Sequence, residues 1–186
     1  MTQEPGTDWP ELLGYMGRFS LDLAELEPEA FPMTYPRVGA TDDDIREAEE
    51  RIGFALDPLH KRLLQTGNGW PGTLITTGDL LGTGELGASS AWSTAVARLD
   101  DSYRRGAATA PPREEIYPIA AFWDTPEVAA IWREGPVTDG GHPVLWFDVA
   151  VTRSWPNLWE WWTDMLRSRR EIVAVARRSH ESEQKK

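Results

Sequence analysis

Two short helices, each with its own start and stop signal, are predicted within residues 41–72, TDDDIREAEERIGFALDPLHKRLLQTGNGWPG. Thr41 is placed to cap the first helix, with Asp44 three residues later as its capping-box partner, and Gly53 is placed to end it. Three aspartates in the first turn suit the positive end of the helix dipole. Helices this short are marginal alone in water, so we expect their apolar sides to be buried on a sheet.

The second helix is predicted to begin after Asp57, an N-cap residue, with Pro58 at its first position. Its buried face is predicted at Leu59, Leu63 and Leu64. Gly67 is expected to stop this helix, and Asn68-Gly69 to form a turn. Trp70 then follows directly, where we expect it to cover the junction between the two helices.

The remaining elements are less sharply marked. Helices are predicted at residues 8–27, 88–103, 125–132 and 157–178, the third of them capped by Thr125 and Pro126. Strands are predicted at residues 74–77, 116–123 and 143–151, the last of them apolar enough to be central. On the helix at 88–103, the buried face is predicted at Trp92, Val96 and Leu99.

No internal repeat or domain boundary is visible. Residues 1–40 are therefore expected to form an N-terminal helix and a proline-rich connector within the same domain as residues 41–178. The connector, residues 28–40, contains three prolines and should be extended. Residues 179–186 are polar and are predicted to be a disordered tail.

Composition excludes several classes of protein. The chain has 186 residues and no cysteine, so it can bury a core of its own and can contain neither a disulfide nor a cysteine-bound zinc. The start of the sequence lacks the pattern of a signal peptide, and no apolar run approaches the length of a transmembrane helix. A cytoplasmic protein without membrane contact, a monomer or weak dimer, is expected.

The charge is strongly negative and uneven. The net charge is −11, and residues 1–60 alone carry 14 acidic and four basic side chains. Such a surface repels phosphate backbones, so nucleic-acid binding is not expected. It would attract a basic protein and speed the encounter with it. The alternative is that the acidity serves only solubility.

Candidate catalytic, cofactor and metal sites are weak. Residues 82–87 match the GxGxxG pattern of dinucleotide sites, but Glu85 would oppose a pyrophosphate and Asp100 falls in a helix instead of at a strand end. A flexible loop is the preferred interpretation. His60 is predicted on a solvated helix face, and His142 and Asp148 are too far apart on one strand to pair. We expect no catalytic residue, no metal and no cofactor.

Ten tryptophans are unusual in a chain of this length, since tryptophan serves cores, interfaces and sugar-stacking sites alike. Those of interest as surface aromatics are Trp92, Trp123, Trp132, Trp155 and Trp161. Trp123 and Trp132 stand beside charged residues at predicted loop ends, as a binding hot spot with a polar rim requires. Each could equally belong to the core.

The pattern of residues 41–70 resembles the SUKH superfamily, which covers bacterial immunity proteins of polymorphic toxin systems and fungal regulators of cell-wall synthesis. The residues that carry the resemblance include Thr41, Glu49, Gly53, Leu56, Pro58, Leu64, Asn68, Gly69 and Trp70. The resemblance implies a single α+β domain with a mostly antiparallel central sheet flanked by helices. It further implies protein binding and not catalysis. The motif residues themselves are interpreted as structural.

The leading hypothesis is therefore a non-catalytic immunity protein that binds and neutralises a toxin domain, such as a basic nuclease. The alternatives are a regulatory or scaffolding module in cell-wall or signalling pathways, and a tryptophan-lined binder of carbohydrate or another small ligand. The partner surface is predicted between Gly78 and Gly135, where the chain departs from the family pattern. Its candidate residues are Asp79, Glu85, Trp92, Trp123, Asp124, Trp132 and Glu134.

Overall fold

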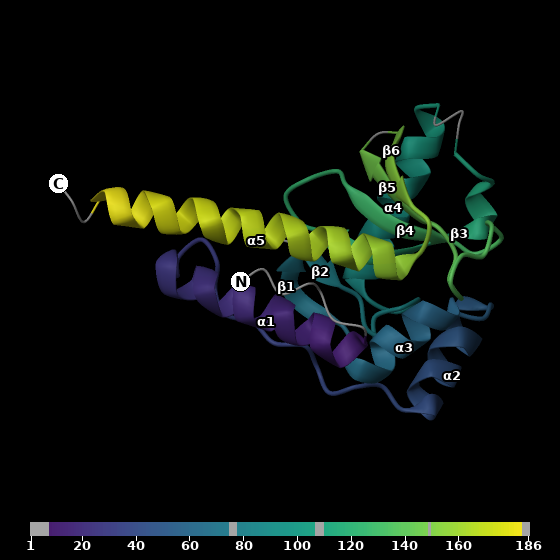
Figure 1. The fold of residues 1–186 in the computed structure, drawn as a ribbon. Helices are drawn as coiled ribbons and strands as arrows, with labels where there is room; N and C mark the ends of the chain where they lie inside the picture. The colour runs from purple at the N-terminus through teal and green to yellow at the C-terminus, as the bar shows by residue number, and fades with distance from the viewer. Residues whose placement is uncertain (1–7, 75–77, 107–109, 149, 184–186) are drawn as a thin grey trace.

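A six-stranded antiparallel sheet forms the centre of the molecule, and five α-helices surround it (Figure 1). The computed structural model describes residues 8–74, 78–106, 110–148 and 150–183. These counts refer to those residues. The predicted fold class, a single α+β domain with an antiparallel central sheet, is confirmed.

The strands follow one another in the sheet in the order of the sequence, so that each pairs with its neighbour along the chain. They are β1 (Trp70–Leu74), β2 (Gly78–Leu80), β3 (Ile116–Phe122), β4 (Val128–Trp132), β5 (Val144–Asp148) and β6 (Ala150–Trp155). The strands β1 and β6 are the two edges. In the centre, Ala121 of β3 lies opposite Asp79 of β2 on one side and Val128 of β4 on the other.

The helices cover both faces of this sheet. They are α1 (Trp9–Leu26), α2 (Asp42–Ile52), α3 (Pro58–Thr66), α4 (Ser90–Arg104) and α5 (Leu158–Glu183), with a short 3₁₀ turn at Arg113–Glu115. Helix α4 packs on β3, β4 and β5, whereas α5 crosses the strands on the side that also holds α1 and α3 (Figure 1). All seven residues of β3 are buried, because helices cover that strand on both faces.

Helices α1 and α5 lie side by side (Figure 1). Trp9, Leu12 and Leu13 of α1 belong to the same core cluster as Trp161 and Trp162 of α5. Farther along the pair, Leu23 packs with Val173 and Ala176, and Asp22 forms an ion pair of 2.8 Å with Arg177. The N-terminal helix is thus packed into the core along much of its length.

The local signals of residues 41–67 act as predicted. Thr41 accepts the Asp44 N–H and its own N–H donates to the Asp44 carboxylate, which completes the capping box. Gly53 ends α2 in the left-handed conformation, with φ of 83°. Asp57 caps α3 and Pro58 is its first residue. Glu49 accepts the Leu56 N–H at 2.7 Å, which fixes the crossing between the two helices.

Several predicted elements are wrong. Residues 125–132 are not a helix, because Val128–Trp132 forms β4, a buried strand with apolar side chains on both faces. The predicted strand at 143–151 is two strands, β5 and the start of β6. The strand predicted at 74–77 is β1, which already begins at Trp70, while residues 75–77 lie outside the described part.

The end of α5 and the buried face of α4 also need correction. Helix α5 continues to Glu183, so residues 179–183 of the predicted disordered tail are helical, and 184–186 lie outside the described residues. The buried residues of α4 are Ala91, Ala95, Leu99 and Ser102, with Trp92 and Val96 only half-buried beside them. Across the described ranges, every helix is too short or too polar to cross a membrane.

Candidate protein-binding surface

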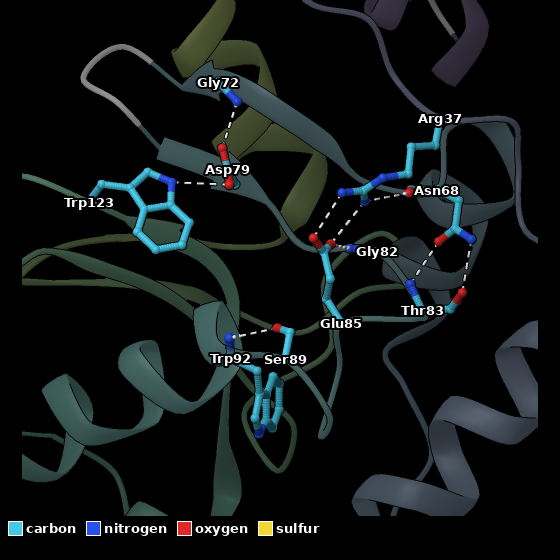
Figure 2. Close-up of polar contacts among 10 residues, drawn as sticks. All are labelled: Arg37, Asn68, Gly72, Asp79, Gly82, Thr83, Glu85, Ser89, Trp92 and Trp123. Atoms are coloured by element: carbon cyan, nitrogen blue, oxygen red, sulfur yellow. Dashed lines mark hydrogen bonds and ion pairs between the residues drawn. The ribbon is translucent and has the colours of Figure 1, made fainter.

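Trp123 directly follows β3 and is fixed at the surface by Asp79 of the neighbouring strand β2. Its indole N–H donates to one carboxylate oxygen of Asp79 at 3.0 Å, and the other oxygen of Asp79 accepts the Gly72 N–H at 2.7 Å (Figure 2). The guanidinium of Arg98 donates to the carbonyls of Phe122 and Trp123. Trp123 still remains 47% exposed. The structure therefore brings two of the predicted residues, Asp79 and Trp123, into contact, with exposed Asp124 next in sequence.

Glu85 is engaged within the chain. Its carboxylate receives both arms of the Arg37 guanidinium, at 2.8 and 2.9 Å, and also the Gly82 N–H at 2.6 Å (Figure 2). Arg51 of α2 adds hydrogen bonds to the carbonyls of Thr83 and Leu86. These hydrogen bonds hold the loop at 82–87 against the connector and α2.

Asn68, the first residue of the Asn-Gly-Trp motif, also binds the loop at 82–87. The Asn68 side chain donates to Thr83 Oγ1 at 2.9 Å and accepts the Thr83 N–H at 2.7 Å.

The indole of Trp70 is 1% exposed and donates to Thr34 Oγ1 of the connector at 3.1 Å. A Cβ at Gly17 of α1 would meet that ring at 3.7 Å. Trp70 thus packs towards α1 and the connector, not over the α2–α3 junction as predicted.

The other predicted residues do not join the Trp123 surface. Trp132 lies opposite Ile116 at the far end of β3, and its indole donates to Glu115 at 2.8 Å. Glu134 pairs with Arg133 at 2.5 Å. Trp92 is half-buried against the core at the start of α4. Two of the remaining aromatics are also covered, since Trp161 is fully buried and Trp155 is half-buried.

The outer face of α2 is acidic. Asp42, Asp43, Glu47 and Glu50 are exposed on it. Arg46 reaches Asp43 at 2.5 Å and Glu50 at 3.7 Å, while Arg51 is directed to the carbonyls of the neighbouring loop. Hydrogen bonds from the Thr41 side chain and backbone lower the pKa of Asp44 below 3.8, so this carboxyl stays charged. The face therefore keeps a net negative charge.

A buried polar cluster at the start of α3 escaped sequence analysis. Asp57 is 2% exposed, and one of its oxygens accepts the N–H groups of Leu59 and His60. The other oxygen lies 2.8 Å from both the backbone nitrogen and Nδ1 of His142. The acidic partner of His142 is thus Asp57, which comes from another element, and not Asp148, which was expected to lie too far away.

His60 is fully buried, so its predicted place on a solvated face is wrong. The Asp57 N–H donates to the Tyr117 hydroxyl oxygen at 3.1 Å, and that hydroxyl lies 3.2 Å from His60 Nδ1. Burial lowers the pKa of His60 from 6.5 to about 4, partly offset by the charge of Asp57, and raises the pKa of Tyr117 well above 10.

An aspartate that orients a histidine is also the arrangement used by general-base sites. Here the Asp57 carboxylate accepts three backbone N–H groups besides the ring. Its geometry is that of a clamp between α3 and the loop before β5. Within the described ranges, no group of three or more His, Cys, Asp or Glu side chains is arranged to hold a metal ion.

No family model matches the chain, and no curated protein matches it in sequence. Among solved structures, the chain is similar to a protein from Pseudomonas syringae pv. tomato known from a crystal structure. The two share 17% identity with a TM-score of 0.48, over 79% of this chain and 98% of the other.

Proposed function

We propose that this chain is a non-catalytic, cytoplasmic immunity protein of the SUKH type, which binds a basic toxin domain and blocks its activity. The observation that carries the proposal is Trp123, a large aromatic side chain fixed at the surface by Asp79. The resemblance of residues 41–70 to the SUKH pattern supports the family. The net charge of −11 supports the choice of a basic partner.

Trp123 has the properties of an interface hot spot. Tryptophan buries a large apolar area on binding, and a side chain already fixed in the free protein loses little conformational freedom. Asp124 beside it is exposed and would lie at the rim of the contact. The acidic face of α2 would act at longer range, since it steers a positively charged partner and raises the association rate.

The test is co-expression with the toxin encoded beside this gene, combined with a measurement of the dissociation constant. Trp123→Ala should weaken binding about tenfold or more and reduce protection of the cells. Val175→Ala, at another exposed apolar position on α5, should leave both unchanged. If the wild-type protein does not protect, the immunity role for that toxin is wrong. If Trp123→Ala protects as well as wild type, the binding surface lies elsewhere.

Charge reversal on α2 tests the steering step separately. Glu47→Lys with Glu50→Lys should slow association at low salt and leave dissociation nearly unchanged. Glu171→Lys with Glu181→Lys on α5 is the matched control, because it reverses two exposed glutamates and changes the net charge by the same amount. Equal association rates for all variants at low salt would contradict steering by α2.

A regulatory or scaffolding module would instead bind several endogenous proteins and no toxin. A carbohydrate binder would use the same exposed indole, because sugar rings stack on tryptophan. Titration with oligosaccharides would then change the fluorescence of the wild-type protein and not that of Trp123→Ala.

A further inference from the structure

A hollow of about 590 Å³ lies between α1 and the connector of residues 28–40. Leu21 and Tyr35 line it and are 46% and 69% exposed, so two of the larger exposed apolar side chains of the chain border one depression. Leu13 and Trp70 also line it and are buried. Its volume falls within the range of pockets that bind ligands.

Glycines leave this hollow open. Gly14 and Gly17 are inside α1, where glycine is a poor helix former, and both line the hollow. A Cβ at Gly14 would meet no atom within 4 Å, and one at Gly17 would meet only the ring of Trp70 at 3.7 Å. Neither position has a positive φ. Packing and backbone conformation within this chain therefore do not require glycine at Gly14, and a large side chain at this position would fill the hollow.

The charge around the hollow differs from that of the whole protein. Arg18 lines it, and Arg62 lines an adjoining hollow of about 360 Å³ that shares Pro10 and Thr66 with the first. Both arginines are exposed, and neither has an ion-pair partner among the described residues. Of the described residues that line the two hollows, Asp8 is the sole acid, and its carboxylate accepts the Glu11 N–H. An acidic chain thus has a locally basic, apolar groove.

We propose that this groove binds a short peptide segment of another protein, one that combines an apolar side chain with neighbouring carboxylates. The apolar side chain would lie over Gly14, between Leu21 and Tyr35. The carboxylates would pair with Arg18 and Arg62, whose guanidinium groups favour carboxylate partners. This surface is made of residues other than those of the Trp123 surface and selects for the opposite charge.

Selection of a random peptide library on the wild-type protein tests the proposal before the natural partner is identified. The enriched peptides should combine apolar and acidic residues. A synthetic copy of an enriched peptide should bind Gly14→Leu, which fills the hollow, and Arg18→Glu, which reverses the charge, about tenfold or more weakly. Gly14→Ala adds a single methyl group and should retain most of the affinity. Trp123→Ala should bind the peptide as wild type does.

Helix content and melting temperature provide the fold control, because leucine and alanine are both better helix formers than glycine. The proposal is overturned if no peptide is enriched, if the enriched peptides lack acidic residues, or if Gly14→Leu binds them unchanged. It is also overturned if the wild-type protein is a dimer that Gly14→Leu converts to a monomer, since a second copy would then be the occupant. Failure of the toxin test with Trp123→Ala would leave this result unaffected.

Discussion

Gly69 passes so close to Gly82 that a Cβ on Gly69 would lie 2.6 Å from the Gly82 nitrogen. The same crossing places a Cβ on Gly82 2.4 Å from the Asn68 carbonyl oxygen. Neither residue can therefore carry a side chain without a shift of backbone. The crossing ties the end of α3 to the loop before α4, and it brings Arg37 onto Glu85 (Figure 2).

Gly69→Ala should be strongly destabilising for two reasons. Gly69 has φ of 81°, a left-handed conformation that costs alanine about 1 kcal/mol, and the added methyl group would also collide with the backbone of Gly82. We expect a loss of more than about 2 kcal/mol in the free energy of unfolding. Urea denaturation followed by tryptophan fluorescence measures it.

Two other glycines separate these causes. Gly53 has φ of 83° with no atom within 4 Å of an added Cβ, so Gly53→Ala should show the conformational cost alone, about 1 kcal/mol. Gly84, in the same loop as Gly82, has neither a positive φ nor a close neighbour, so Gly84→Ala should change little. Equal losses for Gly53→Ala and Gly69→Ala would show that the close approach to Gly82 is not maintained in solution.

Asp57 should be the most sensitive polar residue of the core. Asp57→Ala leaves the N–H groups of Leu59, His60 and His142 without their acceptor, and we expect a loss of about 3 kcal/mol or more. His142→Ala removes only the ring contact and should cost about 1 kcal/mol. Hydrogen exchange of those three amides provides a local readout. Unchanged exchange in Asp57→Ala would rule out the clamp.

Local signals in the sequence predicted the fold best. The caps of α2 and α3 depend on residues within four positions of one another, so Thr41, Gly53 and Asp57 could be interpreted independently of the fold. Strand β4 was missed because Thr125 and Pro126 look like a helix start, while the pairing that makes Val128–Trp132 a strand comes from β3 and β5.

Long-range contacts explain most of what the sequence could not predict about the site. Asp57 and His142 are 85 positions apart, and Asp79 and Trp123 are 44 apart. Trp123 was predicted as a surface aromatic from its charged neighbours, but the carboxylate that fixes it was not. The sequence around His60, HKR, is the same for a buried and for a solvated histidine. The Tyr117 hydroxyl that His60 contacts comes from β3, far along the chain, and local sequence does not reveal that contact.

His60 should make the protein less stable in mild acid. Burial holds its pKa at about 4, below its ordinary value of 6.5, so between these values the unfolded chain binds a proton that the folded protein excludes. This contribution to stability is complete above about pH 6.5 and is lost as the pH falls towards 4, amounting to roughly 2 kcal/mol between pH 7 and pH 5.

The measurement is urea denaturation across that range for wild type and His60→Gln, which cannot titrate. The variant should be less stable at neutral pH but should show a flatter pH dependence, and the difference between the two curves isolates His60 from the carboxylates. Parallel curves for wild type and His60→Gln would show that His60 is not buried in the neutral form.

Gly14→Ala should stabilise the protein, in contrast to the glycine substitutions above. Gly14 is inside α1 with helical backbone angles, and a methyl group there would meet no atom within 4 Å. Alanine favours the helix by about 1 kcal/mol relative to glycine, so the melting temperature and the free energy of unfolding should both rise. Gly17→Ala, where the methyl group would make an ordinary contact with Trp70 at 3.7 Å, should stabilise as well. A loss of stability in Gly14→Ala would mean that part of the chain occupies the hollow in solution, and the space would then not be available to a partner.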